Sequence, residues 1–424
     1  MPNLRFNLPV WVWQMLLMGL LGLSGIIFVP VLLRWVEPQL MATVLVAQVY
    51  VYYLVVLVQY GFAFSGPAAV ARAAQGGGAT AVAQVWRSSV RGKLLLLAGP
   101  VALLFGVTNV CMAWGQWYVW VFTVLLVAYA LNSNWWLQAQ QRFAPAVGFA
   151  ALGVLASALV VYGLVGGYVT GAATSQGVWI VWVLVLPQVC VGLGTWWVAR
   201  RACVGQIPEV NDESNLSWIR ADAPLVASQL LLFASTTLGT VVVGGVADAS
   251  TTAAYAAIEK LFNLAATVLV GLYMAAYPRM ATLFYADRGR YWRTTQRLLL
   301  ACVCGGVSLA VVLAWLGPLL LGWYLPVHMV DLVAQALWPL GVWLGLCISQ
   351  HVLTSYMVLA ERERMVLWAN ACVLLATVVV GYGCSLSSPV LWVYGMVAGQ
   401  VLAVIMIQYV ARQDNNWHDK NKNI

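Results

Sequence analysis

The feature that most constrains this chain is the recurrence of apolar runs of about twenty residues along its whole length. A helix of that length crosses the hydrocarbon core of a bilayer, where only helices and closed barrels satisfy their own backbone groups. The runs are too long and too uniformly apolar for barrel strands. Charged residues make up only 8% of the chain, against about 25% in a soluble domain. The sequence therefore predicts an all-α polytopic membrane protein.

About twelve transmembrane helices are expected. The first apolar run follows Arg5 and superficially resembles a secretory signal. That run is longer than a signal's apolar region and no small-residue cleavage site closes it, so it is predicted to be the first span. The predicted spans are residues 10–33, 39–65, 94–114, 117–137, 143–164, 178–199, 223–246, 252–277, 298–321, 332–360, 365–383 and 389–411.

Basic residues are concentrated in alternate connections between these spans. Of the 21 Lys and Arg residues, all but Arg34 and Lys260 fall on the same side as the two termini. Because connections rich in Lys and Arg stay in the cytoplasm, both termini are predicted to be cytoplasmic. The net charge of +8 then reflects topology and contact with lipid head groups, and no nucleic acid is expected as a partner.

The most polar connection, residues 200–222, lies near the middle of the chain and separates six predicted spans from six. Two such halves around a central cavity are a common plan among transporters. The predicted parts are an N-terminal six-helix bundle (1–205), a cytoplasmic linker (206–222), a C-terminal six-helix bundle (223–411) and a cytoplasmic tail (412–424).

Motifs that would indicate an enzyme are missing from the sequence. There is no D-x-D motif, hydrolase elbow, Walker loop or H-E-x-x-H, and the predicted outer connections are too short to form an external domain. The one close cysteine pair, Cys302 and Cys304, lacks the further ligands of a zinc site. We therefore expect no catalytic residue, no metal and no cofactor, and a transport step driven by a gradient or by removal of the substrate.

Three stretches resemble the polysaccharide transporters of the multidrug/oligosaccharidyl-lipid/polysaccharide exporter superfamily, a group that includes the O-antigen (Wzx-type) flippases. They are VPVLLRWVEPQLMATVLVAQ with VQYGFAFSGPAAVAR, then NSNWWLQAQQRF, then AAYAAIEKLFNLAATVLVGLYMAAYPRMATL. The residues that match the family patterns are Pro30, Arg34, Gln48, Tyr60, Gly61, Phe62, Ser65, Trp135, Gln138, Tyr255, Glu259, Lys260, Tyr277, Pro278 and Arg279. The chain departs from these patterns at Glu37, Ala68, Ala69 and Gln141, which bears on the substrate more than on the fold.

The resemblance implies a flippase that moves an undecaprenyl-pyrophosphate-linked oligosaccharide across the bacterial inner membrane by alternating access. Its product would serve cell-surface polysaccharide synthesis, as O-antigen of lipopolysaccharide or as exopolysaccharide. A polysaccharide polymerase and a chain-length regulator are then possible protein partners. Two alternatives stay open: a cation-coupled exporter of small molecules or drugs in the same superfamily, and a scaffold without transport activity.

Two ionisable residues, Glu259 and Lys260, lie deep in the eighth predicted span. Charged groups at such depth are costly unless they are paired or face a wet cavity, which makes them functional candidates. Adjacent residues point about 100° apart on a helix, so the two are not expected to pair with each other. Either they bind substrate or coupling ions, or they form structural bonds between helices.

The remaining candidates are assigned by chemistry. Arg34, at the outer end of the first span, either contacts lipid phosphates or binds the substrate pyrophosphate, for which a guanidinium fork is well suited. At the inner helix ends Arg72, Arg142 and Arg279 either fix the topology or receive the same pyrophosphate. Two glutamines, Gln48 and Gln138, are predicted to contact sugar or to join helices, and His351 to relay protons or to form an interhelical bond.

Overall fold

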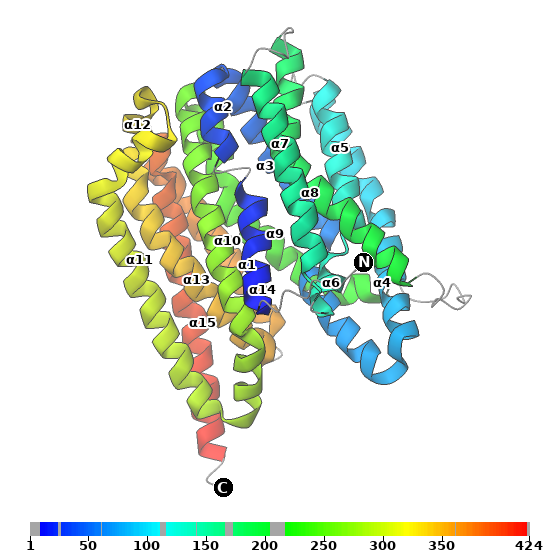
Figure 1. The fold of residues 1–424 in the computed structure, drawn as a ribbon. Helices are drawn as coiled ribbons and strands as arrows, with labels where there is room; N and C mark the ends of the chain where they lie inside the picture. Colours follow the sequence, from blue (N-terminus) through cyan, green and yellow to red (C-terminus); the bar gives the residue numbers. More distant parts are fainter. Residues whose placement is uncertain are drawn as a thin grey trace. The chain divides into compact units, whose positions relative to one another are not determined.

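The computed structural model describes residues 9–23, 27–60, 62–110, 116–140, 142–165, 173–203, 217–360 and 362–421. Every regular element in these ranges is a helix (Figure 1). The all-α membrane fold predicted from the sequence is confirmed, since 11 helices of the described ranges are long and apolar enough to cross a membrane. Residues 12–22 form a further, shorter apolar helix.

The chain divides into two compact units. The first unit comprises Met1–Phe28 and Tyr50–Val226, and the second comprises Val29–Val49 and Ala227–Ile424. Helix α3 (Pro38–Gln59) begins in the second unit and ends in the first, whereas α9 (Ser217–Val246) begins in the first and ends in the second. Of the predicted linker, residues 206–216 lie outside the described ranges, and the rest forms the start of α9.

The helices of each unit follow in chain order. The first unit contains α1 (Val10–Leu23), α4 (Phe62–Val110), α5 (Gln116–Leu131), α6 (Asn134–Ala139), α7 (Ala144–Val165) and α8 (Ala173–Cys203). The second unit contains α2 (Val29–Trp35), α10 (Ala249–Ala286), α11 (Arg288–Tyr324), α12 (Val327–Val333), α13 (Leu337–Leu359), α14 (Glu363–Ser385) and α15 (Val393–Asn421), with short 3-10 turns η2 (Ala334–Ala336) and η3 (Pro389–Trp392).

Several helix ends differ from the spans predicted by hydropathy. The first predicted span is divided between α1 and α2, and the second ends at Gln59 because Tyr60 adopts a left-handed φ of 45°. The predicted connection before Leu94 is helical and belongs to α4, whose apolar arm runs from Gly78 to Gly106. Gly78 separates the two arms of α4 with a φ of 64° and a ψ of −150°, a conformation that glycine adopts without a steric penalty.

Helix α10 starts where Asp248 ends the preceding turn and provides the N-cap. The Asp248 carboxylate accepts hydrogen bonds from the Ser250 and Thr251 backbone nitrogens at 3.0 and 3.2 Å, which satisfies two donors that the first turn leaves unpaired. The hydrogen bond from the Thr251 hydroxyl is the main cause of the lowered pKa of Asp248. Desolvation by burial opposes it, and the backbone hydrogen bonds act in the same direction as the hydroxyl. An ionised carboxylate at this position also interacts favourably with the helix dipole.

Small residues allow the helices of the second unit to pack closely. A Cβ at Gly345 of α13 would lie 2.8 Å from the Cα of Gly306 on α11, and one at Gly341 would lie 2.8 Å from the Cα of Ala310. Such contacts are typical of membrane helices, where close packing replaces the hydrophobic driving force of water.

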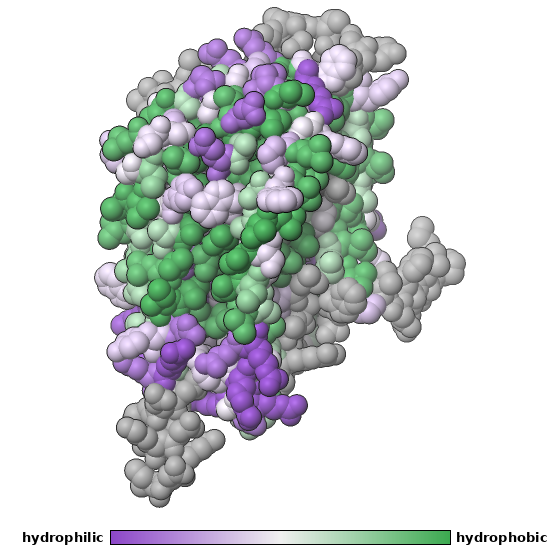
Figure 2. All heavy atoms as spheres, turned by 90° about the vertical axis from the view of Figure 1, so that its left-hand side faces the viewer, coloured by the Kyte–Doolittle hydropathy of each residue, from purple (hydrophilic) through white to green (hydrophobic). Residues whose placement is uncertain are grey.

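Helix α11 exposes apolar side chains on its outward face. Figure 2 shows a broad hydrophobic band on this side of the molecule, with hydrophilic residues at both ends. The apolar side chains that α11 exposes include Leu300, Val311, Trp315 and Leu319, of which Trp315 is 87% exposed. A broad apolar surface of this kind suits contact with lipid, in agreement with the eleven described helices that are long and apolar enough to span a bilayer.

Candidate functional site

The middle of α10 holds the two predicted charged residues, Glu259 and Lys260. The apolar part of this helix covers Ala249–Gly271, so Lys260 lies about 16 Å along the helix axis from its start. Consecutive residues project about 100° apart, and the two side chains indeed reach different helices. The prediction that they would not pair with each other is confirmed by their separate partners, Thr240 and Gln48.

Lys260 faces α3. Its ammonium Nζ donates a hydrogen bond to Oε1 of Gln48, a residue that is 4% exposed. The structure thus brings together two predicted site residues that are 212 positions apart in the sequence. An ammonium carries three N–H donors, of which one is directed to Gln48, and the charge of the adjacent Glu259 also acts on it through space. Lys260 as a whole residue is partly buried.

Glu259 faces α9 and is 4% exposed. Its Oε2 accepts a hydrogen bond from the Thr240 backbone nitrogen at 3.1 Å. Gly239 makes this approach possible, because a Cβ there would lie 2.9 Å from the same carboxylate oxygen and would meet the Tyr255 hydroxyl. The carboxylate is therefore enclosed in a helix contact, where it joins α9 to α10.

Arg34 lies in the last turn of α2 and is exposed. Its Nη2 donates to the backbone oxygen of Trp323 at 2.8 Å. Trp323 belongs to the last turn of α11, whose final carbonyls have no partner within the helix. The positively charged Arg34 caps one of these carbonyls and interacts favourably with the C-terminal end of the helix dipole. A guanidinium has five N–H donors, and the exposed remainder can bind an anion.

The end of α11 connects Arg34 with the middle of α10. The hydroxyl of Tyr324, next to Trp323 in the chain, donates to the backbone oxygen of Ala257 at 3.3 Å. Ala257 precedes Lys260 by less than one helical turn, about 4.5 Å of rise. Arg34 and Lys260 are thus linked through a short series of direct contacts within the second unit.

The other predicted residues lie elsewhere. Gln138, partly buried on α6, and Arg142, exposed just after it, belong to the first unit. Arg72 and Arg279 lie in α4 and α10, and their side chains are outside the described part of the structure.

His351 lies on α13 in the second unit. Its Nδ1 is 2.9 Å from the backbone oxygen of Cys347, one turn earlier in the same helix. Its neighbour Gln350 joins three helices, since Nε2 of Gln350 donates to Oδ1 of Asn370 on α14 at 2.6 Å, and Nδ2 of Asn370 donates to the Ser228 hydroxyl on α9 at 2.8 Å.

Sequence reasoning missed Lys93. It was counted with an inner connection, but the structure places it in α4, where it is 2% exposed. Its Nζ donates to the Asn132 backbone oxygen at 3.0 Å and lies 5.3 and 5.7 Å from the ring centroids of Phe62 and Trp135. The only signal in the sequence is the position of Lys93 immediately before four leucines, which also fits a residue at the end of a span.

Comparison with solved structures defines the class of fold. An inward-facing multidrug resistance MATE family transporter of the MOP superfamily matches with a TM-score of 0.71 at 15% identity, over 98% of this chain and 97% of that one. The eukaryotic MATE transporter AtDTX14 matches with a TM-score of 0.64 at 13% identity, over 95% and 93% of the two chains. The bent form of the Vibrio cholerae MATE transporter VcmN gives 0.60 at 14% identity, over 96% and 97%. The protein is therefore a membrane protein with the MATE fold.

The sequence gives the narrower assignment. The pattern that defines the family "Polysaccharide biosynthesis protein" matches residues 11–284, well over half of the chain. The chain therefore belongs to this family, and the resemblance to polysaccharide transporters found in its three motif stretches is confirmed. Among curated proteins no sequence matches significantly.

Proposed function

We propose that this protein is a flippase that moves an undecaprenyl-pyrophosphate-linked oligosaccharide across the bacterial inner membrane. The observation that carries the proposal is Lys260, a cation in the middle of a membrane span whose described hydrogen-bond partner is the neutral amide of Gln48. A charge is costly in an apolar bundle, and an anionic ligand adds to the favourable interaction that Lys260 already has with the adjacent Glu259. The membership of the polysaccharide biosynthesis family supports a saccharide as the cargo.

The polar groups of the proposed site suit the two parts of such a head group. Lys260 and the exposed donors of Arg34 bind the pyrophosphate, as charge-assisted hydrogen bonds to phosphate oxygens are the strong ones. The amide of Gln48 binds sugar hydroxyls beside it. On the inner side Arg72, Arg142 and Arg279 attract the pyrophosphate at entry, and Gln138 contacts sugar there.

Transport in this proposal follows alternating access. The two predicted six-helix bundles, residues 1–205 and 223–411, change conformation so that the bound head group is exposed first to one side of the membrane and then to the other. The saccharide head stays with the polar groups of the site while the lipid chain stays in the bilayer. Glu259 or His351 couples the cycle to a cation gradient. A polymerase with its chain-length regulator removes the product at the outer leaflet, which favours net outward transport.

A second candidate is a cation-coupled exporter of small molecules. The observation that favours it is the buried carboxyl of Glu259, because carriers of cationic compounds need an acidic group inside the bundle. Against it, the Glu259 carboxyl is already held by the Thr240 backbone, whereas the side chain with donors to spare is the cation Lys260.

Translocation in proteoliposomes tests the proposal. We expect Lys260→Ala to slow the movement of a fluorescent undecaprenyl-pyrophosphate oligosaccharide by about tenfold to a hundredfold, since one hydrogen bond to a charged group contributes about 1.5–3 kcal/mol. Lys260→Arg, which keeps the charge, retains part of the activity. Arg290→Ala is the matched control, because it removes an exposed cation near the start of α11. Equal rates for Lys260→Ala and Arg290→Ala, at equal protein levels, would refute an anion site at Lys260.

A further inference from the structure

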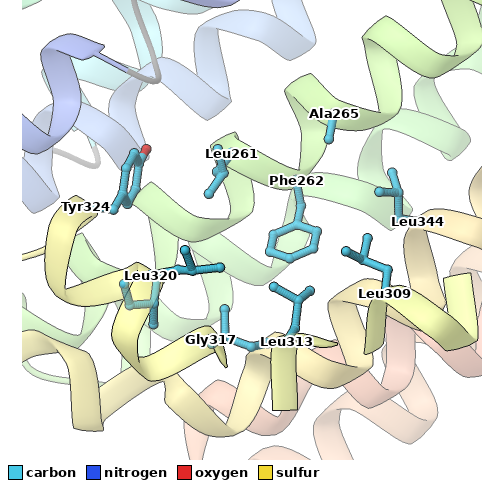
Figure 3. A pocket seen from close by; sticks show the side chains of 11 residues that line it. Leu261, Phe262, Ala265, Leu309, Leu313, Gly317, Leu320, Tyr324 and Leu344 are labelled. Carbon is cyan, nitrogen blue, oxygen red and sulfur yellow. The ribbon is translucent and has the colours of Figure 1, made fainter. Parts of the chain in front are cut away.

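The second unit contains an apolar pocket of about 220 Å³ between α10, α11 and α13 (Figure 3). Phe262 lies in the middle of the view with Leu309 and Leu313 of α11 below it, while Tyr324 and Leu344 mark opposite ends. Gly317 lets the side chain of Leu337 on α13 pack closely against α11, because a Cβ at Gly317 would meet that side chain. The following Pro318 cannot donate a helical hydrogen bond, which favours a bend of α11 at this place.

The lining determines what the pocket can hold. Apart from Tyr324, every residue that lines it is Leu, Phe, Ala or Gly. Water needs two to four polar partners to be stable in a cavity. The polar side-chain group in this lining is the Tyr324 hydroxyl, which already bonds the Ala257 carbonyl, so the pocket suits neither water nor a saccharide. At about 220 Å³ the pocket is smaller than the roughly 300–1,000 Å³ of sites for whole drug-sized ligands. It suits one segment of a hydrocarbon chain.

The pocket opens towards lipid. Leu320 on its rim is 53% exposed, whereas Leu321, Leu337 and Leu344 in its lining are 3%, 2% and 4% exposed. The neighbouring exposed side chains of α11 are themselves apolar, including Trp315 at 87% and Leu319 at 67%. A chain in the bilayer can therefore enter the pocket from the side without crossing water.

The two cations of the candidate site adjoin this pocket. Leu261, which lines it, directly follows Lys260 on α10. At its other end, Tyr324 follows Trp323, whose backbone oxygen holds the Arg34 guanidinium. A hydrocarbon pocket on α10 and α11, the helix that carries Lys260 and the helix whose end holds Arg34, fits the tail of a single amphiphile whose anionic head these cations bind.

We infer that the pocket between α10, α11 and α13 binds a segment of the isoprenoid chain of the lipid-linked substrate, next to the pyrophosphate held by Lys260 and Arg34. The inference rests on the proposed function. It adds a second point of recognition, for the lipid, to the site for the charged head. Each buried methylene contributes about 0.8 kcal/mol, so fewer than two displaced methylenes change binding by about tenfold.

The test uses the full chain in lipid nanodiscs with an undecaprenyl-pyrophosphate analogue that carries a photoreactive diazirine in its isoprenoid chain. In the wild type we expect the label in the peptides that contain Leu261–Ala265 and Leu309–Tyr324. Filling the pocket with Ala265→Phe weakens labelling about tenfold. Ala314→Phe is the matched control, because Ala314 is exposed on α11 and does not line the pocket. A phospholipid with a diazirine in its acyl chain is the comparison probe, which measures labelling by ordinary membrane lipid.

The outcomes separate this inference from the proposed function. Wild-type labelling that spreads evenly over the apolar helices, or that is the same with the phospholipid probe, overturns the pocket assignment even if translocation is intact. Equal labelling of Ala265→Phe and Ala314→Phe, with both variants folded by size exclusion, overturns it as well. Selective labelling of the pocket in a wild-type protein that moves no substrate supports the lipid site and overturns the flippase proposal instead.

Discussion

The hydrogen-bonded network of Gln350, Asn370 and Ser228 joins three helices of the second unit, and we predict that Asn370→Ala destabilises the protein measurably. Asn370 is 2% exposed, accepts from Gln350 at 2.6 Å, and donates to the Ser228 backbone oxygen and hydroxyl at 3.2 and 2.8 Å. Hydrogen bonds between membrane helices contribute about 0.6 kcal/mol each on average, so the three together amount to about 2 kcal/mol.

Unfolding by titration with SDS from a mild detergent measures the loss. Asn370→Leu is expected to lose about the same 2 kcal/mol of hydrogen bonding as Asn370→Ala, but without the additional cost of a cavity. Ser228→Ala removes only the bond to the hydroxyl and is expected to cost about a third as much. Gln296→Ala is the control, since Gln296 is exposed on α11. Free energies of unfolding for Asn370→Ala and Gln296→Ala that agree within about 0.5 kcal/mol would show that the network does not hold the three helices together.

Three further predictions concern packing, capping and a buried charge. Gly345→Val is expected to cost about 1–3 kcal/mol in SDS unfolding, because its Cβ would lie 2.8 Å from the Cα of Gly306; an unchanged stability would contradict the tight contact of α11 with α13. Asp248→Ala is expected to cost about 1 kcal/mol at neutral pH. Because the folded pKa of Asp248 is lowered, the stability it adds is present above the unfolded value of about 3.9 and is lost as pH falls through the folded pKa, so the difference from wild type must shrink in acid. Lys93→Met is expected to keep wild-type thermal stability, since it removes a desolvated charge and retains the chain length, whereas Lys93→Ala lowers it; equal losses in both variants would contradict this.

Much of the fold follows directly from the sequence, because the bilayer leaves few choices. The long apolar runs predict helices, and most runs correspond to one long helix, although the first run is divided between α1 and α2. Hydropathy cannot locate a break within helical sequence, however. Gly78 bends α4 and Tyr60 ends α3 through their backbone conformations, which depend on packing rather than on apolar content.

The sequence singles out the residues of the candidate site, but it predicts only part of their contacts. The depth of Glu259 and Lys260 in one span, and the angle between adjacent residues on a helix, predict two separate partners. Which partners they have depends on the packing of helices far apart in the sequence, as in the contact of Lys260 with Gln48. The same holds for Arg34, whose bond to the carbonyl of Trp323 depends on the position of α11 beside α2. The leucine-rich pocket has no sequence signal, since its residues do not differ from ordinary membrane-facing ones.

The most direct measurement compares two classes of substrate in proteoliposomes that contain the wild-type protein under an imposed proton gradient. One substrate is a fluorescent undecaprenyl-pyrophosphate oligosaccharide, and the other is a small cationic compound of the kind that a drug exporter carries. We predict that the lipid-linked saccharide moves between leaflets only when the protein is present and that the cationic compound is not accumulated. Accumulation of the cationic compound, with no movement of the lipid-linked saccharide, would contradict the flippase assignment and establish the protein as a small-molecule exporter.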